Sequence, residues 1–284
     1  MKKKNLFWLG LVIVVLIVGG TISWFYFSKN NMANTNQVVD RSGSTTTIYL
    51  HGWGASGKST DSMIAYAEKH NHAHKVLTAK VRRDGQISLE GTWPKGTTHP
   101  LIQLVFVDNK NGDYYVTREW FHHLIVLLQK KYRIKRYNTV AHSMGNLTTM
   151  FYQMKYGNSD KLPRLNKQVN LGGHFDGILG MDDKANHNYL LASGRPRYLN
   201  SSYRYLLKHR QNYPKNVSIL NIFGNKKDGT NSDGDVSVVS ARSLRYLLRG
   251  RVNYQEIEVK GAGGQHSQLH ENPRVDQAIG QFLW

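Results

Sequence analysis

The sequence predicts an α/β fold in which a mostly parallel central sheet is flanked by helices. Runs of β-branched and aromatic residues alternate with segments of helical period over most of the chain. The heptapeptide at 140–146 has the form of a direct turn from a strand into a helix. The chain has 284 residues and 40% of them are apolar, which is enough for a sizeable core in one large domain or two small ones.

The expected elements lie between residue 45 and the C-terminus, and we assign 45–284 to the folded domain. Strands are expected at 45–51, 73–82, 86–90, 101–107, 137–141, 168–171, 217–223 and 254–259. Helices are expected at 59–70, 116–132, 146–156, 201–210, 238–248 and 273–282. Strands that alternate with helices in this way indicate a parallel sheet. Segment 172–197 has no clear period, and we expect a cap or substrate loop there.

A long apolar run follows three lysines at the N-terminus. Residues 6–27 are 22 positions without a charge, and a helix rising about 1.5 Å per residue would cross the roughly 30 Å of bilayer hydrocarbon. Lys2–Lys4 favour a cytoplasmic N-terminus. We expect residues 1–27 to form a single-pass membrane anchor, 28–44 a polar linker, and the rest to be extracellular. A signal peptide cleaved near residues 18–20 is the alternative.

Charge and cysteine content narrow the choice of chemistry. The formal net charge is +19, which implies a polyanionic neighbourhood. For a chain outside the cytoplasm, anionic lipid headgroups or cell-wall polymers are better candidates than nucleic acid. The chain has no cysteine, so thiol catalysis, cysteine-based zinc sites and disulfides are excluded. We expect neither a cofactor nor a metal.

The heptapeptide Val-Ala-His-Ser-Met-Gly-Asn at 140–146 matches a nucleophile elbow. A strand that turns directly into a helix holds its serine in a strained conformation, with backbone packed closely on both sides. Small residues are therefore needed two positions before and after the serine, and Ala141 and Gly145 meet this need. Ser143 is the candidate nucleophile.

A serine nucleophile needs a base to take its proton. In one known arrangement the acid and then the histidine follow the serine along the chain, each after a later strand. His266 comes just after the last expected strand, in a glycine-rich loop, and is the preferred base. His270 is the alternative. His174 and His187 come too early in this order.

The acid that orients the base should follow the strand at 217–223. The turn there offers Asp233 and Asp235, and we prefer Asp233 because a Ser-Asp-Gly-x-Val string followed by Ser-Ala is a common acid turn. Asp235 is the alternative acid. Asp228 is read as a turn residue, and Asp176, after an earlier strand, is a remote candidate. An EF-hand calcium loop is excluded because its acidic spacing and terminal Glu are missing.

The tetrahedral intermediate of acyl transfer needs hydrogen-bond donors for its oxyanion. The backbone N–H of Met144 follows the nucleophile directly. The second donor should come from the loop after the first strand, His51-Gly52-Trp53-Gly54, and we assign it to the N–H of Trp53. His51 is expected to pack beneath this loop without acting as a base.

The same loop contains a rival motif. Residues 52–59 match G-x-x-x-x-G-K-[ST], the phosphate-binding loop of nucleotide-binding proteins. In that hypothesis Lys58 would bind phosphates, Ser59 would bind a metal, and Asp108 after an apolar strand would help hold it. The P-loop hypothesis leaves the order Ser143, Asp233, His266 unexplained, so we rank it below a hydrolase.

Four strings together resemble a known family. HGWG, AHSMGN, SDGDV followed by SA, and QHSQLHENP are similar to the membrane-anchored, cell-surface α/β-hydrolases of Gram-positive bacteria, a lipase-like family of unknown function. The resemblance runs from about residue 45 to the C-terminus. It implies the α/β-hydrolase fold, with Ser143 as nucleophile, Asp233 as acid and His266 as base. Asp235 and Ser237 stand where Ile or Val and Pro are commoner in that family.

The sequence thus predicts a membrane-anchored serine hydrolase, most simply a carboxylesterase or lipase-like enzyme acting on a small-molecule or lipid-like ester. A protein of another class remains as an alternative. It would be a non-catalytic surface protein that holds wall or lipid polyanions on its basic face.

Overall fold

The computed structural model describes residues 38–284. The expected anchor at 1–27 and most of the linker lie outside the described residues, so those predictions stay untested. Residues 41–284 form one compact unit. Within residues 38–284, no helix is both long enough and apolar enough to cross a membrane.

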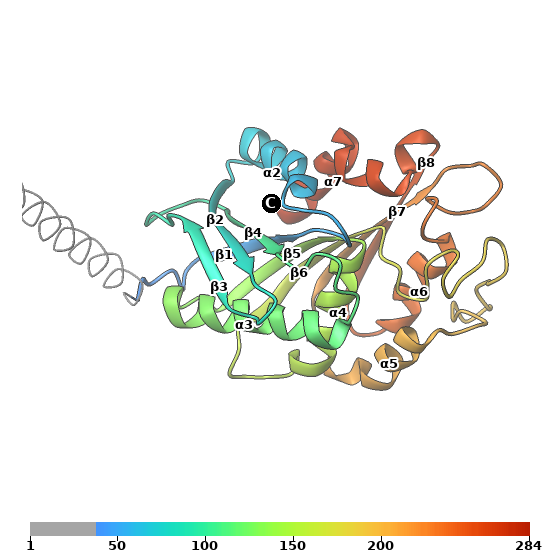
Figure 1. The fold of residues 1–284 in the computed structure, drawn as a ribbon, viewed down its shortest axis with the longest axis horizontal. Coiled ribbons are helices and arrows are strands. Elements are labelled where there is room, and N and C mark those ends of the chain that lie inside the picture. Colours follow the sequence, from blue (N-terminus) through green and yellow to red (C-terminus); the bar gives the residue numbers. More distant parts are fainter. Residues whose placement is uncertain (1–37) are drawn as a thin grey trace, which may run out of the picture. The chain divides into compact units, whose positions relative to one another are not determined.

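An eight-stranded sheet forms the centre of this unit (Figure 1), with its strands in the order β3-β2-β4-β1-β5-β6-β7-β8. The strands are β1 Thr45–Leu50, β2 His74–Val81, β3 Ile87–Gly91, β4 Pro100–Phe106, β5 Arg136–His142, β6 Arg164–Leu171, β7 Ser218–Asn225 and β8 Asn253–Lys260. Only β3 runs antiparallel, paired with β2. The prediction of a mostly parallel sheet is confirmed.

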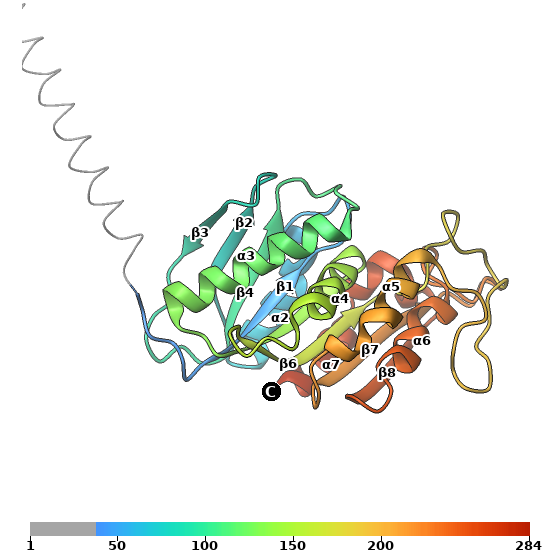
Figure 2. The ribbon, with the colours of Figure 1, turned by 90° about the horizontal axis from the view of Figure 1, so that it is seen from below.

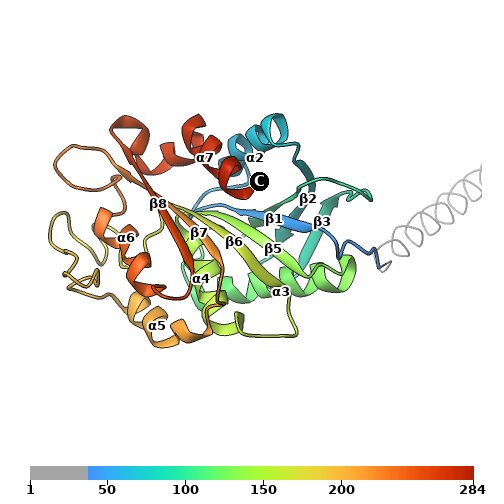
Figure 3. The same ribbon diagram turned by 180° about the vertical axis from the view of Figure 1, so that it is seen from behind.

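Helices cover both faces of the sheet (Figures 1 and 3). They are α2 Lys58–His70, α3 Tyr114–Tyr132, α4 Met144–Tyr156, α5 Ser201–His209, α6 Val238–Leu247 and α7 Pro273–Leu283. Helices α2 and α7 pack together on one face, and α3 and α4 pack together on the other, with α5 against α4. The central strands are therefore buried on both faces, which explains their near-continuous apolar runs.

Several elements begin earlier than the sequence pattern indicates, and in two of them the local cause is visible. Helix α3 starts at Tyr114, two residues before the expected start, because the Asp113 carboxylate accepts hydrogen bonds from the N–H groups of Tyr115 and Val116. Strand β6 starts at Arg164 because its pairing with β5 already begins there. Polar residues in the first half of β6 hide the strand from a hydrophobicity pattern.

Candidate active site

Ser143 lies at the turn between β5 and α4 and has a strained backbone, with φ 50° and ψ −119°. Its N–H donates to the carbonyl of Leu171 on the neighbouring strand, at 2.9 Å. A Cβ added to Gly145 would lie 2.9 Å from the carbonyl oxygen of His51. The small residue expected after the serine is therefore required, because the first strand passes directly behind the turn.

Ser143, His266 and Asp233 form one hydrogen-bonded chain at the carboxyl ends of the strands. The Ser143 Oγ lies 2.9 Å from His266 Nε2, and His266 Nδ1 lies 2.8 Å from Asp233 Oδ2. Asp233 is buried, and its other oxygen accepts the N–H groups of Asp235 and Val236 at 3.0 and 2.7 Å. These bonds fix the carboxylate so that it orients the imidazole.

The other acid candidates lie elsewhere. The Asp235 carboxylate is 61% exposed, and its Oδ2 is 4.0 Å from His266 Nε2, on the serine side of the ring. Asp228 forms an ion pair with Lys226 at 2.9 Å. Asp176 is buried and accepts hydrogen bonds from the Asn200 N–H and the Asn188 amide. Its pKa is raised to about 7 by burial. Of its partners, Asn188 belongs to the 172–197 segment and Asn200 caps α5.

Opposing effects set the pKa of His266. Burial disfavours the charged imidazolium and would lower the pKa, but the hydrogen bond and the charge of Asp233, joined by the charge of Asp235, outweigh it. The pKa of His266 therefore lies above its usual value of 6.5. An imidazole of this kind can accept a proton from a serine hydroxyl near neutral pH.

The remaining histidines near the serine have other partners. His51 is buried, its Nε2 accepts the Phe106 N–H at 3.0 Å, and its Nδ1 donates to the Gly52 carbonyl at 2.8 Å, so it supports the first loop as expected. His142 Nε2 donates to the His266 carbonyl at 3.1 Å. His270 contacts Glu271 and the ring of His142. None of these three has a recorded bond to the Ser143 hydroxyl.

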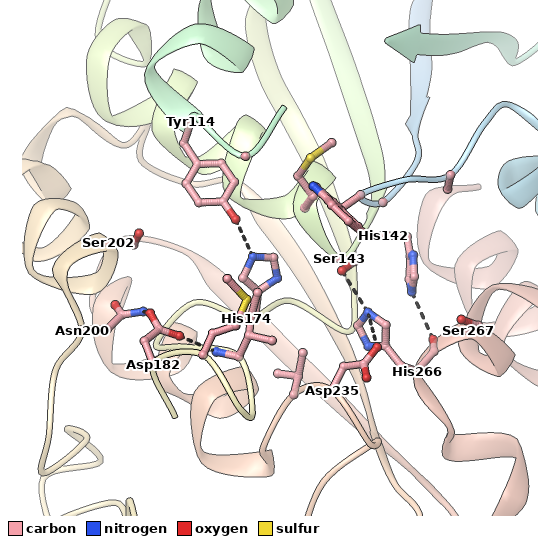
Figure 4. A pocket seen from close by; sticks show the side chains of 18 of the residues that line it. Tyr114, His142, Ser143, His174, Asp182, Asn200, Ser202, Asp235, His266 and Ser267 are labelled. Carbon is pink, nitrogen blue, oxygen red and sulfur yellow. Dashed lines mark hydrogen bonds and ion pairs between the residues drawn. The ribbon is translucent and has the colours of Figure 1, made fainter. Parts of the chain in front are cut away.

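A cavity of about 770 Å³ opens over Ser143 (Figure 4). Its apolar wall consists of Trp53, Ala55, Met144, Ile178, Met181 and Val236. Ile178 and Met181, together with His174 and Asp182, belong to segment 172–197, the expected cap or substrate loop. This segment therefore lines part of the cavity. A largely apolar cavity with few polar groups is typical of small-molecule sites.

Two polar residues of the cavity, Tyr114 and His174, are not expected there from the sequence, which considers His174 only as a base. Tyr114 begins α3, and its hydroxyl lies 2.7 Å from Nε2 of His174 (Figure 4). The Nδ1 of His174 is buried and has no hydrogen-bond partner among residues 38–284. Burial, with the neighbouring His266, lowers the pKa of His174 to about 3, so this imidazole is neutral. The sequence signal for His174 is its position just after strand β6, which comes too early in the chain for the expected base.

The two expected oxyanion donors both line the cavity. Neither the Trp53 N–H nor the Met144 N–H has a hydrogen-bond acceptor in the part of the chain that the structure describes. The Trp53 indole is held separately, because its Nε1 donates to the Lys110 carbonyl at 2.9 Å. A Cβ on Gly52 would lie 3.1 Å from that of Ser143, so this loop passes very close to the nucleophile.

The residues of the P-loop motif do not form a ring of free amides. The N–H groups of Gly54 and Ala55 donate to Asn109 and Gly52, and that of Ser59 donates to the Ser56 carbonyl. Asp108 lies 3.4 Å from Arg83. A P-loop binds phosphate with such amides unpaired, so this arrangement does not favour nucleotide binding. Among residues 38–284, no group of three or more His, Asp or Glu side chains is arranged to hold a metal.

The sheet order and the serine at the strand-to-helix turn define an α/β hydrolase. The chain belongs to the family described as alpha/beta hydrolase of unknown function (DUF915), whose model matches residues 34–284. The family predicted from the four sequence strings is thereby confirmed. No curated protein matches the chain.

Two solved structures have the same fold. The product of gene lin2722 from Listeria innocua is 24% identical, with a TM-score of 0.78, over 84% of this chain and 94% of that one. The "putative cell surface hydrolase" from Lactobacillus plantarum WCFS1 is 22% identical, with a TM-score of 0.70, over 84% of this chain and 91% of that one. At these levels of identity, the similarity shows a shared fold.

Proposed function

We propose that this protein is a membrane-anchored, extracytoplasmic serine hydrolase of the carboxylesterase or lipase-like type. The observation that supports the proposal best is the bonded chain from Ser143 Oγ through His266 to the buried Asp233 carboxylate, at the floor of an apolar cavity. Each of the three residues follows a different strand of a parallel sheet, where the sites of α/β proteins form.

In the proposed mechanism, Ser143 Oγ attacks the carbonyl carbon of an ester while His266 Nε2 takes the serine proton. The carbonyl oxygen becomes an oxyanion that accepts hydrogen bonds from the N–H groups of Met144 and Trp53. The C–O bond to the alcohol then breaks, and the alcohol leaves with the proton from His266. Water, activated by His266, attacks the acyl-enzyme and releases the acid and free Ser143.

The experiment uses the full chain in isolated membranes and a fluorophosphonate probe, which reacts with activated serines. We expect labelling of the wild type at Ser143 and none in Ser143→Ala. Lys58→Ala serves as a control and should keep most of the labelling, whereas a P-loop protein would lose its activity in this variant. A wild-type protein that stays unlabelled and cleaves no short acyl ester would contradict the proposal.

The anchor and the location are part of the same proposal. They are supported by Lys2–Lys4, by the uncharged run at 6–27 and by the cell-surface description of the Lactobacillus plantarum relative. Protease added to intact cells should degrade the hydrolase domain, and alkaline carbonate should leave the uncleaved chain in the membrane. A shorter, soluble chain in the medium would indicate a cleaved signal peptide instead.

The alternative function is a non-catalytic surface protein that binds polyanions, and the net charge of +19 favours it. This alternative predicts salt-sensitive binding of polyanions that Ser143→Ala leaves unchanged. It also predicts that the wild type does not react with the fluorophosphonate probe.

A further inference from the structure

Basic residues are concentrated at one end of the sheet. Four connections lead from helices into the amino ends of β5, β6, β7 and β8. They are residues 129–136, 157–164, 208–217 and 247–253, and we call this group the amino end. They contain twelve Lys or Arg residues and one acid, Asp160. The connection into β5 alone has Lys130, Lys131, Arg133, Lys135 and Arg136.

The opposite end of the sheet, around Ser143, has a different charge. The connections that leave the parallel strands there, which we call the carboxyl end, are residues 51–57, 82–86, 107–113, 172–200, 226–237 and 261–272. They contain ten Asp or Glu residues and eight Lys or Arg residues. Between these two sets of connections, the surplus of positive charge therefore lies at the amino end, away from the candidate active site.

The cations of the amino end are accessible and largely unneutralised. None of the twelve is buried, and nine of them are exposed. Arg164, which contacts Asp160 at 2.6 Å, is the one that has an acidic partner among residues 38–284. Eleven positive charges without carboxylates on one end of a domain give a strong local potential for a polyanionic surface.

The described chain enters the domain at this same end. The N–H of Arg41 donates to the carbonyl of Tyr132, the last residue of α3, at 2.8 Å. Figure 2 shows this first, blue part of the chain beside that end of α3. In the sequence, residues 28–40 separate this point from the apolar run at 6–27. These 13 residues reach at most about 45 Å when fully extended, so a bilayer that holds the run is within reach.

We propose that the amino end is a docking surface for the anionic headgroups of a lipid bilayer. Docking there turns the carboxyl end, with Ser143 and its cavity, away from the membrane. This proposal rests on the anchor that forms part of the proposed function, but not on hydrolase activity. The partner is argued to be a bilayer because the segment that follows the apolar run joins the domain at this end.

The chain has no cysteine, so one introduced cysteine gives a unique label for each end. The exposed residues Asn158, at the amino end, and Ala192, at the carboxyl end, are suitable positions. Full chain with Asn158→Cys or Ala192→Cys carries a donor dye in nanodiscs that contain acceptor-labelled lipid. With phosphatidylglycerol present we expect stronger energy transfer from position 158 than from 192. The difference should vanish in phosphatidylcholine nanodiscs and in 0.5 M salt.

Matched variants show whether docking depends on the cations of the amino end or only on the net charge of the domain. Lys130→Gln, Lys131→Gln, Lys135→Gln and Arg136→Gln together should lower the ratio of docked to undocked domain by roughly 100-fold or more, since each cation near an anionic surface adds to binding. The control removes four cations from the carboxyl end, through Lys184→Gln, Arg195→Gln, Arg197→Gln and Lys227→Gln. It should dock like the wild type.

Two outcomes would overturn the proposal. One is equal energy transfer from both positions, whatever the lipid charge and salt. The other is release of the domain by soluble poly(glycerol phosphate) at a phosphate concentration equal to that of the lipid, which would make a wall-type polymer the preferred partner. Because energy transfer does not depend on catalysis, an inactive protein can still dock. Fluorophosphonate labelling measured in parallel then distinguishes failure of docking from failure of the hydrolase function.

Discussion

Two aspartates lie in the turn after β7, and their side chains face His266 differently. Asp233 is buried and bonded to Nδ1, whereas Asp235 is exposed and lies 4.0 Å from Nε2. From the sequence, both are expected in the turn after the strand at 217–223, and only the family-like string favours Asp233 over Asp235. The side-chain directions follow from the backbone bonds that Asp233 accepts within the turn, which no pattern of residue types reveals.

We expect Asp233→Asn to lower kcat/KM by about 10³- to 10⁴-fold, because the imidazole loses its orienting carboxylate. Asp235→Asn should cost at most about fivefold at neutral pH, as an exposed charge contributes little. A kinetic assay with a short acyl ester measures both. Losses of equal size would contradict the proposed division of roles.

The pH dependence of the reaction gives a second test of these residues. Only neutral His266 can accept the serine proton, so kcat/KM should fall as pH drops through its pKa, which lies above 6.5. Asp235→Asn removes a negative charge that raises this pKa, so the fall should move to lower pH. A profile of kcat/KM between about pH 5 and 9 shows the shift. An unmoved acidic limb would mean that Asp235 does not act on His266.

His174 lines the cavity, and its Nδ1 is buried without a hydrogen-bond partner among residues 38–284. A substrate whose polar atom reaches this nitrogen would satisfy it. We expect His174→Phe to reduce kcat/KM for esters with a hydroxyl or carbonyl near the scissile bond by roughly 10-fold, the cost of one lost hydrogen bond. Simple alkyl esters should be affected less. Tyr114→Phe is the variant to compare with it, because it keeps the His174 imidazole and removes only the hydrogen bond between the Tyr114 hydroxyl and His174 Nε2. Equal losses for both kinds of ester would indicate a structural role.

At the scale of elements, α7 packs on α2 with a buried carboxylate between them. Asp276 is 4% exposed, its Oδ2 accepts only a long 3.4 Å bond from Ser62, and its Oδ1 has no partner among residues 38–284. Burial raises its pKa to about 6 from the usual 3.8. The folded state thus holds the proton more tightly than the unfolded state does.

The free energy of unfolding should therefore fall as pH rises from about 4 to about 6 and stay lower above that range. The size of this loss is on the order of 2 kcal/mol. In Asp276→Asn the dependence should largely disappear, and the variant should gain stability relative to the wild type as pH rises. Urea denaturation at pH 4.5 and 7.5 measures the difference. If the two proteins differ in free energy of unfolding by the same amount at pH 4.5 and at pH 7.5, the buried Asp276 carboxylate is not the cause of the pH dependence.

Helices and strands were predictable because most have strong periodic patterns, and every expected element in residues 45–284 is present with shifted ends. The exceptions have local causes. The start of α3 depends on the Asp113 side chain, and the first half of β6 is specified by its partner β5. The segment after β6 has no hydrophobic period because it forms neither a helix nor a strand. Its backbone is held instead by side chains: Asp176 accepts the Asn200 N–H, and Asn188 accepts the Tyr198 N–H.

At the scale of the whole molecule, the candidate site exists only when the sheet is assembled. Ser143 and His266 are 123 residues apart in the chain, and they meet because β5, β7 and β8 lie in one parallel sheet. We expect the rate of fluorophosphonate labelling and the tryptophan fluorescence to be lost at the same urea concentration. Labelling that disappears at lower urea would show instead that the site opens while the sheet persists.

The position of His266 on the last strand-to-helix connection also has a consequence in time. A growing chain contains Ser143 and the two proposed oxyanion amides long before His266, the proposed base, which follows the last strand of the sheet, β8. The serine therefore stays a weak nucleophile until the connection after β8 has been made and has folded against it. In the proposed mechanism, the order of synthesis thus makes assembly of the sheet through β8 a condition for reactivity.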